Sequence, residues 1–131
     1  MIKSILASIF MLTALGTASA AICPPEKTLN GLVTLVETYN TSNKDKISLD
    51  IYKDDEAVSI VKALREEFGA PNLKFVDALV ALTFPDKSVN VGAFDKDEQG
   101  TLCFIGKMTF TPEKWNIIIE KAVGFEVNNA Q

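Results

Sequence analysis

The chain has 131 residues, of which 13 are basic and 17 acidic, and it contains no histidine. An acidic chain without clustered Lys and Arg argues against binding to nucleic acid. The missing histidine removes Ser-His and Cys-His nucleophile pairs and the usual zinc ligands, and the sequence carries no Gly-rich phosphate loop. We therefore expect a protein that is not an enzyme and that holds no cofactor.

Residues 1–20 have the three-part layout of a secretory signal peptide. Lys3 supplies a positive start, residues 5–15 form an apolar run, and Ala18, Ser19 and Ala20 offer small residues before a cleavage site. The run is shorter than the ~20 residues that span a bilayer. Cleavage after Ala20 predicts an exported protein, in the periplasm or secreted.

The expected mature chain, residues 21–131, is the size of one domain and contains no further stretch long enough to cross a membrane. It loses one lysine, so its net charge is 12 − 17 = −5. Lipid attachment at Cys23 is the alternative to simple cleavage, but it requires a small residue directly before the cysteine. The large Ile22 stands there, which argues against it.

Cys23 and Cys103 are the two cysteines of the chain. An even pair in an oxidising compartment predicts a disulfide, which here would close a loop of 103 − 23 = 80 residues. A catalytic dithiol is disfavoured because redox cysteines usually lie two residues apart. We predict a structural bond.

The first predicted helix follows Pro24 and Pro25, with Thr28 as its cap and apolar residues at helical spacing from Leu29 to Tyr39. A strand over residues 32–39 is the alternative, since glycine and β-branched residues weaken the helical pattern. A second helix has Asp54 as its cap. Its apolar stripe comprises Ala57, Ile60, Val61, Leu64 and Phe68, and Gly69 closes it.

Residues 47–52 alternate between apolar and polar side chains, which predicts a half-buried strand. Three further strands are predicted over residues 78–84, 89–94 and 101–108. The short connections between these three strands favour antiparallel neighbours and hence a meander.

Thr111 and Pro112 predict the start of a last helix, and Gly124 its end. Together these elements predict a two-layer α+β domain, in which helices cover one face of an antiparallel three- to four-stranded meander. The single disulfide would tie the last strand to the chain before the first helix.

The stretch from Asp95 to Gly100 resembles part of a calcium-binding loop. Counted from Asp95, however, the twelfth position is Gly106, which has no side-chain oxygen, and the flanks are strands. We therefore predict a hairpin turn without a metal, in which Gly100 adopts a positive φ.

Asp50, Asp77 and Glu120 are the carboxylates that could face a cleft, and nothing in the sequence places two of them together. Asp77 lies among apolar residues, so it is either buried with a shifted pKa or, as is more usual, placed at the edge of a strand or as the cap of a turn. These residues do not change the expectation of a non-enzymatic protein.

We expect a protein-binding, inhibitory or accessory module that acts on another protein of the cell envelope or the extracellular space. The expected contact regions are the loops 40–46, 85–88 and 95–100, because loops on a rigid scaffold often carry function. The candidate interaction residues are Asn40, Lys44, Asp86, Lys87, Asp95, Asp97 and Glu98.

Two alternatives remain open. The aromatic residues Phe84, Phe94 and Phe104 form a second candidate contact face, although such residues more often pack in a core. The alternative function is a carrier or sensor-like domain that holds a small apolar ligand between the helices and the sheet.

Overall fold

A computed structural model describes residues 23–130, so the predicted signal peptide lies outside the described part of the chain. In chain order, the elements are η2 (Pro25–Lys27), α1 (Leu29–Ser42), β2 (Ser48–Lys53), α2 (Asp54–Phe68), β3 (Ala78–Thr83), β4 (Val89–Lys96), β5 (Leu102–Phe110) and α3 (Pro112–Ala130). None of the helices in residues 23–130 has the length and apolar character needed to cross a membrane.

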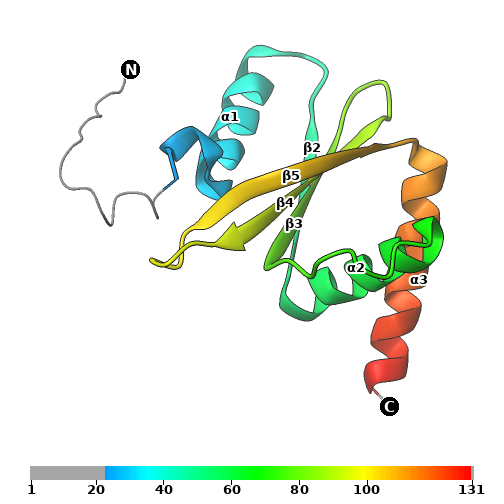
Figure 1. Ribbon diagram of the computed structural model, residues 1–131. Coiled ribbons are helices and arrows are strands. Elements are labelled where there is room, and N and C mark those ends of the chain that lie inside the picture. Colours follow the sequence, from blue (N-terminus) through cyan, green and yellow to red (C-terminus); the bar gives the residue numbers. More distant parts are fainter. Residues whose placement is uncertain (1–22, 131) are drawn as a thin grey trace.

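The four strands form one antiparallel sheet in the order β2-β3-β4-β5. Each strand pairs with the next strand along the chain, which confirms the predicted α+β class and the predicted meander. Figure 1 shows β5 at the front of the sheet, α1 on one side of it, and α2 with α3 on the other side.

Helices cover both faces of the sheet, whereas the sequence analysis predicts a single covered face. On one face, Leu79 and Ala81 of β3 belong to the core beneath α2 and α3. On the other face, Ala78 and Val80 join a smaller core that includes Leu29 of α1. Successive side chains of a strand point to opposite faces, so β3 is buried on both sides.

The start of α1 agrees with the prediction. The Thr28 hydroxyl oxygen accepts a hydrogen bond from the backbone N–H of Gly31 at 2.9 Å, and the helix follows. The alternative of a strand over residues 32–39 is wrong, because α1 runs through all of them.

The predicted end of α2 is confirmed, but its predicted cap is wrong. Gly69 adopts the left-handed conformation, with φ 58°, directly after the helix. At the other end, Lys53 precedes the helix and no side chain caps it. Asp54 has φ 53°, because the chain turns here from β2 straight into α2, and its side chain therefore does not serve as the cap.

The predicted start of α3 is confirmed, since the backbone N–H of Lys114 donates to the Thr111 hydroxyl at 3.2 Å. The predicted end at Gly124 is wrong, because α3 continues to Ala130. A glycine inside a helix costs only about 1 kcal/mol relative to alanine. The adjacent Phe125 packs against the core, and this contact keeps the chain helical beyond Gly124.

Gly31 allows η2 to lie close to α1, since a Cβ at this position would overlap the carbonyl oxygen of Pro25. Gly31→Ala is therefore expected to lower the free energy of unfolding by about 1–3 kcal/mol through overpacking. Urea unfolding followed by far-UV circular dichroism measures the change. The control is Gly124→Ala, where a Cβ meets open space and helix propensity predicts a gain of up to ~1 kcal/mol. Equal stability of Gly31→Ala and the wild type would contradict the close approach.

The predicted disulfide joins Cys23 to Cys103, with the two Cα atoms 6.2 Å apart. Beside it, Thr28 forms an isolated antiparallel bridge with Cys103. The start of α1 is thereby fastened to the first part of β5.

Candidate functional site

β5 is an edge strand whose outer side is largely unpaired. Its inner side pairs with β4. On its outer side, residues 23–130 supply one bridge, from Thr28 to Cys103. Residues 104–110 of β5 are called the open edge below, because such a strand presents unpaired backbone N–H and C=O groups.

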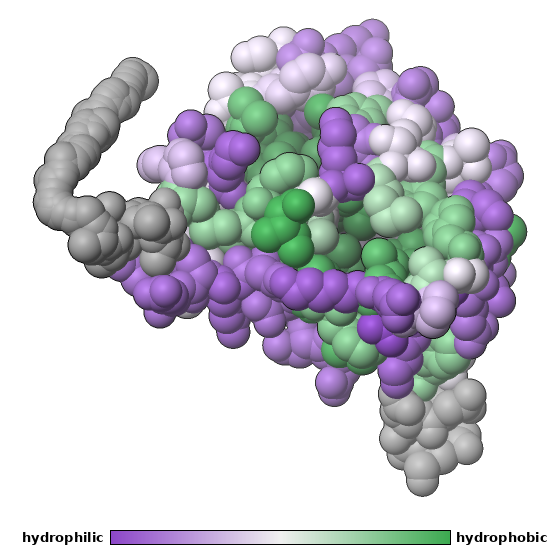
Figure 2. Space-filling view, viewed as in Figure 1, coloured by the Kyte–Doolittle hydropathy of each residue, from purple (hydrophilic) through white to green (hydrophobic). Residues whose placement is uncertain are grey.

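Three large apolar side chains of the open edge are partly exposed. Phe104 is 38% exposed, Ile105 50% and Met108 38%. Figure 2 shows hydrophobic surface gathered in the middle of this face of the molecule and surrounded by hydrophilic residues. Large exposed apolar patches often mark interaction sites.

A β-bulge determines where the side chains of the open edge point. Ala93 of β4 pairs with Gly106, whereas the next residue, Phe94, pairs with Phe104. Ile105 therefore has no partner on β4, and a bulge of this kind turns neighbouring side chains to new directions. As a result, Phe104 lines a cavity beside α1, and Ile105 lines a second cavity beside α2.

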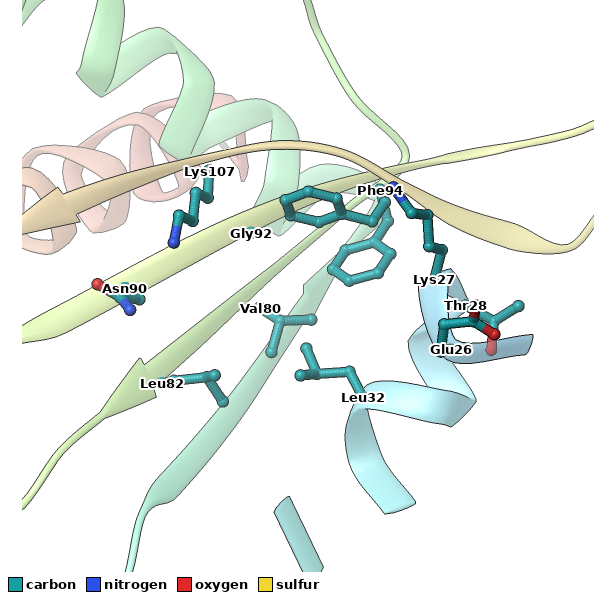
Figure 3. Close-up of a pocket in the computed structure, with 11 residues that line it drawn as sticks. Glu26, Lys27, Thr28, Leu32, Val80, Leu82, Asn90, Gly92, Phe94 and Lys107 are labelled. Atoms are coloured by element: carbon teal, nitrogen blue, oxygen red, sulfur yellow. The ribbon is translucent and has the colours of Figure 1, made fainter. Parts of the chain in front are cut away.

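The cavity beside α1, called the α1 cavity, has a volume of about 230 Å³. Gly92 forms part of its lining, and a Cβ there would lie 3.3 Å from the ring of Phe94. In Figure 3, Lys27 and Lys107 lie on opposite sides of the cavity. The cavity is lined by Glu26, Lys27, Thr28, Leu32, Val80, Leu82, Asn90, Gly92, Phe94, Phe104 and Lys107.

The cavity beside α2, called the α2 cavity, has a volume of about 270 Å³. Gly106 lines it, and a Cβ there would meet no atom within 4 Å, so the cavity is open next to β5. Lys107 lines both cavities, which places the open edge between them. The α2 cavity is lined by Val61, Leu64, Leu73, Lys74, Val76, Leu79, Val91, Ala93, Ile105, Gly106, Lys107 and Met108.

Most of the charged residues that line the two cavities are basic, although the chain as a whole is acidic. Their charged lining residues are Lys27, Lys74 and Lys107, against the single acid Glu26. Lys74 donates to Asp95 at 2.6 Å, and this hydrogen bond raises the pKa of the lysine. Lys107 is the middle residue of the open edge, so a carboxylate beside it would be attracted.

The structure does not bring the three predicted contact loops together. Loop 40–46 and turn 85–88 lie at the end of the sheet where β2 begins and β3 ends, since Ser48 pairs with Thr83. Turn 95–100 joins β4 to β5 at the opposite end of the sheet.

Two of the predicted contact residues hold their own loops in shape. The Asn40 side chain exchanges two hydrogen bonds with the backbone of Ile47, at 2.9 and 2.8 Å. One carboxylate oxygen of Asp86 accepts from the hydroxyl and the backbone N–H of Ser88, and these bonds lower the pKa of Asp86. The remaining loop candidates without such a bond in the described structure, Lys44, Lys87 and Glu98, are exposed.

The acidic turn is held by Asp97, whose Oδ1 accepts from the backbone N–H groups of Gln99 and Thr101 at 2.8 and 3.0 Å. Gly100 has φ 82°, which confirms its predicted positive φ. Asp97 also lies near the sulfur atoms of Cys23 and Cys103. Both sulfur atoms form the disulfide, so neither is a thiolate that could bind a metal.

Asp77 directly precedes β3 and is exposed, so the alternative of burial is wrong and the more usual position at a strand edge is confirmed. Its Oδ2 accepts from the N–H of Lys96 at 2.8 Å, and its own N–H donates to Asp95 at 3.0 Å. The carboxylates of Asp50, on β2, and Glu120, on α3, belong to exposed residues of other elements.

The aromatic candidates serve different purposes. Phe94 is 1% exposed and belongs to the core, whereas its neighbour Phe104 is exposed at the surface, with the ring centroids 5.8 Å apart. Phe84 lies beyond the end of β3, next to turn 85–88. Phe104 is the aromatic candidate that belongs to the open edge.

The fold and the site define a small, disulfide-linked α+β domain with an apolar open edge between two cavities. No protein-family model, curated protein or solved structure matches the chain. The geometry of the open edge is therefore the main indication of function.

Proposed function

We propose that this protein is a small exported protein-binding module, inhibitory or accessory in role, that holds a partner protein through the open edge. The observation that carries the proposal is the row of exposed side chains, Phe104, Ile105 and Met108, along an unpaired backbone. Export is supported by the sequence of residues 1–20, and the partner would then belong to the cell envelope or the extracellular space.

A carrier of a small apolar ligand is the second candidate, because the exposed surface of both cavities is mainly apolar. Their volumes, about 230 and 270 Å³, lie below the range of about 300–1,000 Å³ that is typical of sites for drug-sized ligands. Each cavity also adjoins the exposed open edge. Cavities of this size suit single large side chains of a partner protein better than a complete ligand.

The proposal is tested by placing a photoreactive phenylalanine analogue at position 105 and irradiating the protein in its native source. We expect one discrete adduct with another protein, because Ile105 is 50% exposed in the centre of the proposed contact surface. The matched control carries the analogue at position 35 on α1, where Leu35 is 67% exposed and lines neither cavity.

A second substitution in the cross-linking protein tests the surface itself. Met108→Lys is expected to reduce the adduct at least tenfold, a loss of about 1.4 kcal/mol in binding, because it would bury an unpaired charge. The same change at Val123, an exposed residue of α3, should leave the adduct unchanged. Absence of a discrete adduct at position 105, or an equal adduct at position 35, would refute the proposal.

A further inference from the structure

We infer that the partner docks as an extended strand added to the open edge, with apolar side chains entering both cavities and a carboxylate beside Lys107. This inference rests on the proposed function and names the chemistry of the partner: an acidic, extended segment of a protein that carries apolar side chains at neighbouring positions, one for each face of the sheet.

The exposed side chains are only part of what the open edge presents. Phe104, Ile105 and Met108 are 38%, 50% and 38% exposed, so a partner would cover no more than half of each side chain. The outward-facing backbone groups of the same strand are the other part.

An added strand forms hydrogen bonds with the outward-facing backbone groups of the open edge, and each such bond makes a small net contribution to binding. A helix laid on the same surface would leave the outward-facing N–H and C=O groups of residues 104–110 without protein partners. Strand addition is therefore the docking mode that uses what the open edge presents.

The two cavities match the side-chain period of an added strand. They lie on opposite faces of the sheet and share Lys107, which belongs to the open edge. Successive side chains of a strand point to opposite faces, so neighbouring residues of the partner would approach the two cavities in turn. Gly92 keeps space in the α1 cavity, and Gly106 keeps the α2 cavity open beside β5.

The position of Lys107 argues for a different protein rather than a second copy of this chain. Lys107 is the middle residue of the stretch 104–110, so two copies of that stretch paired antiparallel in full would place the two lysines opposite each other. Like charges directly opposite in a sheet are destabilising. An aspartate or glutamate at that position of a partner would instead form a favourable cross-strand pair.

The first experiment selects binders to the full chain from a library of random linear heptapeptides. We expect the selected peptides to share apolar residues at neighbouring positions, one for each cavity, and an enrichment of Asp or Glu. Two variants of the selected peptide carry methyl groups on alternate backbone nitrogens, one at the odd positions and the other at the even positions. One of the two registers is expected to bind at least tenfold more weakly, because one set of amides would pair with the open edge. Hydrogen exchange should show protection of residues 104–110 by the unmethylated peptide.

Gly92→Val and Gly106→Val test the two cavities separately. Each valine occupies space in one cavity, and each is expected to weaken binding of the selected peptide at least tenfold. Gly124→Ala is the matched glycine control on α3 and should leave binding unchanged. Both variants are expected to fold, since valine is favoured in strands. Urea unfolding of each variant distinguishes a loss of binding from a loss of folding.

Several outcomes would overturn the inference. The inference is wrong if the selected peptides have apolar residues at helical spacing or are enriched in Lys or Arg. It is also wrong if binding survives backbone methylation in both registers, or if neither valine substitution weakens binding. Dimerisation of the full chain through protected residues 104–110 would replace the acidic partner with a second copy. The cross-linking experiment at position 105 does not depend on the docking mode, so its failure alone refutes the proposed function.

Discussion

Ile118→Ala is expected to lower the free energy of unfolding by about 2–5 kcal/mol, the usual range for an isoleucine truncated in a core. Ile118 is fully buried on the face of α3 that packs against α2 and the sheet. The substitution removes its contacts and leaves a cavity that close-packed neighbours fill only in part. Urea unfolding monitored by Trp115 fluorescence measures the loss.

Ile117 provides the matched control, because it has the same side chain, lies one residue earlier in the same helix, and is 41% exposed. Ile117→Ala is expected to change stability by no more than about 1 kcal/mol, since surface substitutions have small effects and alanine favours helices. Similar losses for the two variants would show that α3 does not pack through the face described above.

Replacing both cysteines, by Cys23→Ser together with Cys103→Ser, is expected to lower the free energy of unfolding by about 3–5 kcal/mol. The disulfide closes a loop of 80 residues, and the chain-entropy model assigns such a loop about 4–5 kcal/mol. Typical small domains have about 5–15 kcal/mol in total, so the variant keeps only part of its stability. The measurement is urea unfolding at neutral pH.

Dithiothreitol separates the bond from the serine substitutions. The reduced wild-type protein should unfold at about the same urea concentration as the double variant, and the variant should not respond to the reductant. A loss below about 1 kcal/mol for both would mean that the bond contributes little to the stability of this domain.

Most elements of the fold could be predicted from local patterns, since cap residues, turn residues and side-chain periods act over a few neighbours. Thr28, Gly69 and Thr111 each mark a helix boundary as expected. The roles of Gly31 and Gly124 were harder to predict from the sequence. Gly31 permits the close approach of η2 to α1, whereas Gly124 is tolerated inside a helix because of tertiary packing.

The placement of α1 on the second face of the sheet has one signal in the sequence. The run Ala78–Thr83 is apolar at nearly every position, which is typical of a strand buried on both sides, whereas a strand with one wet face alternates. The number and order of the elements predict one covered face, whereas this apolar run indicates two.

The open edge could not be predicted in detail, because it depends on pairing between distant residues. The bulge opposite Ala93 and Phe94 arises from the register between β4 and β5, and no local pattern in residues 102–110 reports it. The polar loops were easier to predict from the sequence than the open edge, but they say less about where a partner would bind. Asp86 and Asp97 are placed there by turn chemistry, since each accepts hydrogen bonds from its own turn.

The bridge from Thr28 to Cys103, locked beside the disulfide, closes the outer side of β5 at one end. Any strand that joins the sheet at β5 must therefore stop there, and the seven residues from 104 to 110 can receive a segment of only about 23 Å. Oxidation of the two cysteines thus limits how far pairing along β5 can extend. A long exposed edge would invite repeated stacking of chains. Along β5, the covalent bond shortens the stretch of backbone that is open to pairing.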